Sequence, residues 1–277
     1  MTKDAIHFGP RLVGTPTGKL RAALLVRPST AIETATPLYG EPGAIYTRAL
    51  EQHEILRKTL EFFGCETLIV EANNDDPFAS SVVDAAVAFE DGAFIMRPTA
   101  MSRRGEADRF RAQCSEFDVP IAGHIAAPGL LDGGDIVLAG HTAFVGIGAN
   151  GNAVGRSGFA AVAQAHGYTV VEVYVQIPNA PLRGVLGTLA KDTLVYAEGA
   201  LDASVFSGFN TVVLERGEAM AAGVLCLGEH HVIADVRYRT ALARMRKAGV
   251  VVEGIDLYDF EKIGITPSML ALALKRD

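Results

Sequence analysis

The sequence predicts an α/β protein built by repeating one unit, in which a β-hairpin is followed by a helix and a further strand. Three observations predict it. Pairs of apolar runs meet across short polar turns, glycines stand between helical stretches and β-branched runs, and the pattern returns about every 45 to 55 residues. Four such units can be read in chain order, with no linker or low-complexity segment between them.

The hairpins are the clearest part of each unit. Each pairs two apolar runs across a turn rich in glycine, aspartate, histidine or lysine, which is the ordinary signal of a β-hairpin. The four candidates are residues 86–96, 136–145, 187–196 and 224–233.

Three joints between a helix and a strand look alike. Gly64, Gly167 and Gly249 each follow a helical stretch and precede a β-branched run. We therefore expect each glycine to end its helix in the left-handed conformation. A fifth unit can be assembled from the two ends of the chain: a C-terminal strand, a strand at 20–27, a helix around 45–63 and a strand at 66–71. By itself the repeat fits either a closed ring or an open sheet.

Composition limits the function. The chain has 277 residues, of which 49% are hydrophobic and 21% charged, so it can bury a large core. A net charge of −7 without a basic block argues against a nucleic-acid partner. Apolar runs are too short for a membrane helix and no secretory segment opens the chain, so we expect a cytoplasmic protein with no membrane partner.

The cysteines are widely spaced and form neither a disulfide framework nor a metal motif. We interpret Cys65 and Cys114 as small core residues, and Cys226 as a buried strand residue that is the only cysteine worth testing as a nucleophile. The histidines show no spacing typical of a metal site either.

One acidic motif, Asp132-Gly133-Gly134-Asp135, comes directly before a strong strand. Its two glycines allow a tight turn or a close approach to a ligand, and its flanking carboxylates can point into one pocket. A plain Asp-Gly turn is the alternative.

Together with Arg97-Pro98 and Ser102-Arg103-Arg104-Gly105-Glu106, this motif resembles the dimethylarginine dimethylaminohydrolases of the guanidine-modifying (pentein) superfamily. The resemblance runs from residues 49–53 to Ser268. It implies one domain over residues 1–277, a five-bladed α/β propeller of ββαβ repeats with pseudo-fivefold symmetry, and no cofactor. We interpret Arg103 and Arg104 as scaffold residues that pair with carboxylates.

The resemblance also implies binding residues. Asp84 matches the second carboxylate of a Phe-Val-Glu-Asp pattern that binds the guanidinium, whereas Val83 stands at the glutamate position. Arg97 matches a residue that binds the substrate α-carboxylate, and Asn150 stands where a second such arginine is expected. Asp135 matches a structural or substrate-facing carboxylate.

The catalytic positions depart from the family. Ser268 falls at the place of the nucleophilic cysteine, and Pro181 falls at the place of the catalytic histidine. Asp132 matches the carboxylate that orients that histidine. His124, which ends a strand just before the acidic motif, is the best substitute base. Ser268 is then either a nucleophile or a hydrogen-bonding group.

We therefore expect a dimethylargininase-like hydrolase, or a related enzyme, that acts on a C–N bond of a small amino-acid-like, carboxylate-bearing substrate. A non-catalytic binding protein and a different reaction run by carboxylate acid–base chemistry are the alternatives. The expected partner is the small-molecule substrate, and a homodimer stays open.

Overall fold

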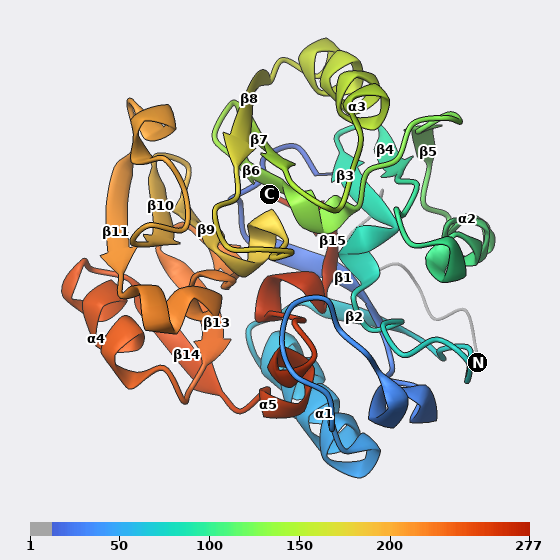
Figure 1. The fold of residues 1–277 in the computed structure, drawn as a ribbon, viewed down its shortest axis with the longest axis horizontal. Coiled ribbons are helices and arrows are strands. Elements are labelled where there is room, and N and C mark those ends of the chain that lie inside the picture. Colours follow the sequence, from blue (N-terminus) through green and yellow to red (C-terminus); the bar gives the residue numbers. More distant parts are fainter. Residues whose placement is uncertain (1–12) are drawn as a thin grey trace.

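The strands form a ring of five three-stranded sheets, seen end-on in Figure 1, in a computed structural model that describes residues 13–277. In every sheet the first strand runs antiparallel to the second, and the third runs parallel to the second. In that order the sheets are β15 (Leu272–Arg276), β1 (Leu20–Val26) and β2 (Glu66–Val70); β3 (Ala86–Phe89), β4 (Gly92–Ile95) and β5 (Ile121–His124); β6 (Ile136–Ala139), β7 (Thr142–Ile147) and β8 (Thr169–Tyr174); β9 (Leu186–Ala190), β10 (Thr193–Ala197) and β11 (Asn210–Leu214); and β12 (Leu225–Gly228), β13 (His231–Asp235) and β14 (Val251–Ile255). The repeated unit is confirmed, and its arrangement is a closed ring of five blades.

The helices connect the two parallel strands of each blade, because a parallel pair needs a crossover. They are α1 (Tyr46–Phe62), α2 (Gly105–Glu116), α3 (Ala153–Ala165) and α4 (Arg239–Lys247). The fourth blade departs from this pattern, since a 3₁₀ turn, Ala203–Phe206, lies between β10 and β11 where the others have an α-helix. A fifth helix, α5 (Tyr258–Lys262), precedes the last strand. No helix within residues 13–277 is both long and apolar enough to cross a membrane.

The two ends of the described chain complete the first blade. Strand β15 pairs with β1 and places Leu272 opposite Leu24, while β2 pairs with the other edge of β1. The fifth unit assembled from the sequence is therefore confirmed. The three predicted glycine caps are confirmed too, because Gly64, Gly167 and Gly249 have φ values of 81°, 80° and 86°.

The core lies between the inner strands and under the helices. Strand β9 is buried along its whole length and contacts β6 on one side and β12 on the other, while β15 contacts β3. Each α-helix on the outside of the ring turns one apolar face to its sheet, with Leu56, Phe110, Phe159 and Met245 buried from α1, α2, α3 and α4 respectively.

Buried carboxylates join neighbouring blades where the backbone leaves its sheets. Asp84 Oδ1 accepts the backbone N–H of Gly134 at 2.8 Å, and Asp135 Oδ1 accepts that of Leu182, also at 2.8 Å. These bonds link the second blade to the third and the third to the fourth. A buried N–H without a partner costs about 1–3 kcal/mol, so the two aspartates replace the sheet partners that these turns lack.

The glycines of the acidic motif serve a close approach of two turns. A Cβ on Gly133 would lie 1.9 Å from the carbonyl oxygen of Val83, and a Cβ on Gly134 would lie 2.5 Å from Asp84 Oδ1. The turn at 133–135 is therefore pressed directly against the 3₁₀ turn Val82–Asp84. Any side chain at Gly133 would separate the second and third blades.

We predict that Gly133→Ala destabilises the fold by about 1–3 kcal/mol or more, because the added methyl group meets rigid backbone rather than a side chain. Urea unfolding of both proteins measures this. Gly158→Ala on the exposed face of α3 is the matched control, since nothing lies within 4 Å of its new Cβ, and it should be neutral or stabilising. Equal effects of the two changes would contradict the close approach.

A second prediction concerns Asp135, which is only 1% exposed and whose Oδ2 has no hydrogen-bond partner within residues 13–277. Burial raises the pKa of this carboxyl from 3.8 to about 7. The folded protein thus holds this proton more tightly than the unfolded chain. The resulting stability is fully present below about pH 4 and is lost as the pH rises through about 7.

Asp135→Asn keeps an oxygen for the Leu182 N–H and removes the titration. We expect this variant to be more stable than the unmodified protein at pH 8. Between about pH 5 and 8 the free energy of unfolding of the unmodified protein should fall with pH more steeply than that of the variant. The two slopes should differ by up to ~1.4 kcal/mol per pH unit. Chemical unfolding across this range tests it, with the exposed Asp75→Asn as control. An unchanged slope would mean that Asp135 is ionised in the folded protein.

Candidate functional site

A cavity of about 340 Å³ opens where turns from several blades meet at one end of the ring. Its wall combines acidic residues with apolar ones. Asp84, Asp132 and Arg103 lie in this wall, together with Tyr39 and Met269. We call this cavity the acidic pocket.

Asp84 is fixed on all sides. It is 3% exposed, its Oδ1 accepts the N–H of Gly134, and its Oδ2 accepts the hydroxyl of Ser81 at 2.6 Å and Nη1 of Arg103 at 2.8 Å. A carboxylate that accepts from three donors cannot turn toward a ligand without losing one of these hydrogen bonds. Asp84 therefore contributes a fixed negative charge.

Arg103 is shared between two carboxylates. Besides Asp84, it binds Glu106 through both edges of the fork, with Nε 2.6 Å from Oε1 and Nη2 2.9 Å from Oε2. Burial is the main reason why the pKa of Glu106 rises to about 8. The prediction of carboxylate pairing is confirmed for Arg103, whereas Arg104 forms no ion pair with a carboxylate of residues 13–277 and its buried Nε has no partner there. The guanidinium of Arg103 also lines the pocket, which no pattern in the sequence indicated.

Asp132 is the acidic residue with a free oxygen. Its Oδ1 accepts the N–H of Thr99 at 2.6 Å, whereas its Oδ2 accepts no hydrogen bond from the described chain. Burial and then the charge of Asp84 raise the pKa of Asp132 to about 6, against the opposing effect of Arg103. At neutral pH this carboxyl can therefore both hold a cation and exchange a proton.

The structure brings two further predicted residues to this region. Asn150 lies in the pocket wall, and its carbonyl accepts the N–H of Asp132 at 2.9 Å. Asp135 lies beneath the wall and does not line the cavity. Its bond to Leu182 makes it a structural residue rather than a substrate-facing one.

Arg97 does not reach the acidic pocket. Its backbone forms an isolated bridge with Leu131, and its Nη1 donates to the carbonyl of Gly129 at 3.0 Å. Its guanidinium is thus bonded to the loop before Leu131, and Arg97 does not line the cavity. The prediction that Arg97 holds a ligand carboxylate at Asp84 and Asp132 is not supported by this geometry.

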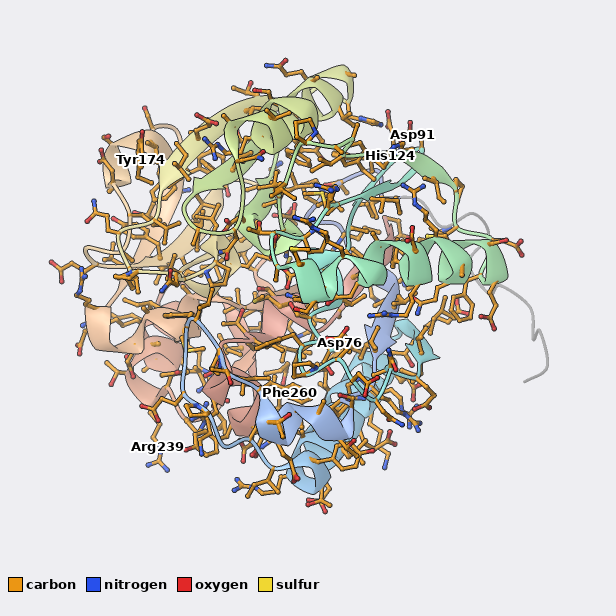
Figure 2. The ribbon with its side chains drawn as sticks, turned by 45° about the vertical axis from the view of Figure 1, so that its right-hand side comes forward. Asp76, Asp91, His124, Tyr174, Arg239 and Phe260 are labelled. Carbon is orange, nitrogen blue, oxygen red and sulfur yellow. The ribbon has the colours of Figure 1, made fainter. Side chains whose placement is uncertain are left out.

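His124 lies on the outside of the molecule. It ends β5, the strand farthest from the ring centre in its sheet, and its side chain is exposed (Figure 2). The sequence showed correctly that a strand ends there, but β5 is an edge strand without a fully buried residue, and its last residue is exposed. His124 therefore cannot act as the base of the acidic pocket.

Ser268 lies on the opposite side of a turn from this pocket. The 3₁₀ turn Pro267–Met269 sends Met269 into the acidic pocket and Ser268 into a second cavity. The Ser268 hydroxyl lies 3.2 Å from Thr266 Oγ1 and 3.4 Å from the carbonyl of Arg183. The geometry therefore supports neither a nucleophile nor a ligand-binding hydroxyl at Ser268 in the acidic pocket.

No thiol takes its place among the described residues. Cys65 and Cys114 are buried elsewhere, and burial raises the pKa of these thiols to about 12 and about 11. Cys226 lines the second cavity, and burial raises its pKa as well. Within residues 13–277 no group of His, Cys, Asp and Glu side chains is arranged to hold a metal ion.

Comparison with known proteins gives the relationship. No family model matches the chain. It is 27% identical to the N(G),N(G)-dimethylarginine dimethylaminohydrolase of Pseudomonas aeruginosa, over 84% of this chain and 90% of the relative. It is 31% identical to the enzyme of the same name from Streptomyces coelicolor, over 92% of this chain and 97% of the relative.

Solved structures show the same fold. A dimethylarginine dimethylaminohydrolase from Pseudomonas aeruginosa, complexed with citrulline, superposes with a TM-score of 0.84 at 23% identity, covering 92% of this chain and 99% of that one. The N-terminal domain of ArgZ, an arginine dihydrolase from cyanobacteria, superposes with a TM-score of 0.81 at 17% identity, covering 93% and 98%. Since the Streptomyces relative matches nearly the whole of both chains at 31% identity, the protein belongs to the dimethylarginine dimethylaminohydrolase family.

Proposed function

We propose that this protein is a hydrolase that cleaves a C–N bond of a small guanidino or amidino compound in the acidic pocket, with Asp132 handling the proton. One observation carries the proposal. Asp132 presents a free carboxylate oxygen beside the fixed charge of Asp84, and its pKa lies near 6. The names of the relatives, dimethylarginine dimethylaminohydrolases, support the substrate class.

The charge of the pocket favours a cation. Asp84, Glu106 and Asp132 surround a single guanidinium, that of Arg103, and Arg103 is already engaged by the first two. The negative charge of Asp132 therefore remains for the ligand. A guanidinium or amidinium matches it, because one of its N–H groups can donate a charge-assisted hydrogen bond to the free Oδ2 of Asp132.

The reaction needs a proton acceptor near the central carbon of such a group. In the proposed step a water oxygen bonds to that carbon while Asp132 takes one proton from the water. The C–N bond to the leaving amine then breaks, and Asp132 returns the proton to the departing nitrogen. The products are a urea- or amide-type compound and an amine, and no further reactant is required.

The remaining lining of the pocket indicates the charge and polarity of the ligand at the end away from its guanidino or amidino group. Apart from the engaged Arg103, its described lining holds no cationic side chain. Asn150 and Asn179 supply neutral polar groups, and Leu38 and Tyr39 supply apolar surface. We infer that the substrate is neutral or partly apolar at this end. This differs from the carboxylate-bearing substrate expected from the sequence, since Arg97 points elsewhere.

A second candidate is a binding protein that takes the same ligand without turnover. The observation that favours it is the absence of Cys, His and Lys from the described lining of the pocket. Thiol-based cleavage of arginine or methylated arginine has no nucleophile here. The two candidates therefore agree on the ligand and differ only in whether product forms.

We predict that agmatine, a guanidino compound without a carboxylate, binds at least as tightly as arginine. Asp132→Asn should weaken agmatine about tenfold to a hundredfold, because one charge-assisted hydrogen-bond pair is worth roughly 1.5–3 kcal/mol. Titration calorimetry measures both affinities. Asp75→Asn, on the surface, should change neither. Binding that Asp132→Asn leaves intact would place the ligand outside the acidic pocket.

We also predict the pH dependence of turnover. The base must be ionised, so the release of amine from a guanidino substrate should rise as the pH passes about 6 and then level off. Asp132→Asn should lower the rate by roughly 10²–10⁴, and prior alkylation with iodoacetamide should not lower it, because no described pocket residue is a cysteine. Tight binding without any amine release would favour the binding protein, and loss of turnover on alkylation would contradict both the site and the mechanism.

A further inference from the structure

The second cavity, of about 90 Å³, lies on the other side of the turn Pro267–Met269 from the acidic pocket. We call it the inner cavity. Most of its described wall is apolar, and its only charged lining residues there are Arg183 and Arg276. Arg183 follows Pro181 in the fourth blade, whereas Arg276 lies on β15 of the first blade.

Neither arginine pairs with a carboxylate of residues 13–277. Arg276 is 8% exposed, and it donates from Nη1 to the carbonyl of Gly18 at 2.8 Å and from Nη2 to that of Cys226 at 2.7 Å. Arg183 makes two longer bonds to carbonyls, from Nε to Gly133 at 3.3 Å and from Nη1 to Ser268 at 3.4 Å. No Asp or Glu oxygen of the described chain lies within ion-pair distance of either.

Two guanidinium groups facing one small cavity are costly without a counter-charge. Burial, together with the positive charge of Arg276, lowers the pKa of Arg183 from 12.5 to about 10, against the opposing effect of the Asp84 charge. Arg183 nevertheless remains cationic at neutral pH. Within residues 13–277 the two guanidinium groups of this cavity donate their hydrogen bonds to carbonyl oxygens and not to carboxylates.

We propose that the inner cavity binds one small inorganic oxyanion of the size of sulfate or phosphate. Arginine forks match such oxyanions in charge and shape, and Arg183 Nη2 donates to no acceptor of the described chain. The hydroxyl of Ser268, whose own hydrogen bonds are long, is the third donor. A volume of about 90 Å³ exceeds several-fold the ~10–15 Å³ that one water needs, so one oxyanion fits.

This site gives Ser268 a role that does not depend on the acidic pocket. The anion would bridge the fourth blade, through Arg183, to the first blade, through Ser268 and Arg276. Arg183 also holds the carbonyl of Gly133, the residue that presses against Val83. Bound anion therefore stabilises the centre of the ring, and the stabilisation grows with the logarithm of its concentration.

Equilibrium dialysis with ³⁵S-labelled sulfate tests the proposal, together with thermal unfolding in sodium sulfate against sodium gluconate at equal ionic strength. We expect one saturable sulfate per chain and a higher unfolding midpoint in sulfate. Arg183→Gln should weaken sulfate about tenfold to a hundredfold, and Ser268→Ala about twofold to tenfold. Arg239→Gln, at an exposed arginine far from the cavity, is the matched control and should change nothing (Figure 2).

The proposal is overturned if the unmodified protein binds no sulfate and no phosphate, or if folded Arg183→Gln binds sulfate as tightly as before. Should Arg183→Gln fail to fold, Ser268→Ala decides, since an unchanged affinity would exclude the cavity. Asp132→Asn must leave sulfate binding intact, which separates this site from the acidic pocket. A sulfate that Arg239→Gln weakens equally would be a surface ion and would also overturn the proposal.

Discussion

The constraint on which the rest of this structure depends is the close approach of the turns at the centre of the ring. Gly133 touches the backbone of Val83 so closely that no side chain fits between them. These turns are not part of a sheet, so their backbone N–H groups need acceptors other than the carbonyl groups of a neighbouring strand. Asp84 and Asp135 supply these acceptors, each reaching from its own blade into the next.

The same requirement shapes the acidic pocket. Asp84 is committed on both oxygens to its role in the ring, to Ser81 and to Arg103, so it offers charge but no free hydrogen-bonding atom. Arg103 is likewise committed to Asp84 and Glu106. Asp132 is the exception, because only one of its oxygens is used by the backbone. The chemistry of the pocket therefore depends on a single carboxyl whose pKa is set by residues that hold the fold.

The repetitive parts of the fold could be predicted from the sequence. Alternating hairpins and the glycines at 64, 167 and 249 are local signals, and local backbone preferences decide them. The first blade could be assembled because a pattern present four times leaves an unpaired strand near each end of the chain. In the fourth blade the chain does not form the α-helix of the other blades, and the 3₁₀ turn Ala203–Phe206 lies between β10 and β11 instead.

The side of the ring to which a residue points could not be predicted in the same way. His124 ends a strand and Arg97 comes shortly after one, as expected. The side chain of His124 is exposed to solvent, whereas that of Arg97 donates to the carbonyl of Gly129. Their direction depends on where β5 and β4 stand within a blade, and that is a property of the assembled ring. Arg103 was assigned to the scaffold correctly, but its place in the pocket wall follows from the position of Asp84 across the turn.

Ser268 and Met269 show this limit most sharply. In a tight 3₁₀ turn two successive side chains leave on different sides, so a shift of one residue exchanges the two cavities. Met269 brings a thioether methyl beside Gly134 and Asp84, an apolar group at the floor of the acidic pocket. Apolar surroundings disfavour an ionised carboxyl, which is the main reason why the pKa of Asp132 rises. Met269 therefore adds an apolar group to the wall of the acidic pocket, whereas Ser268, its neighbour in the turn, lines the cavity that Arg183 and Arg276 also line.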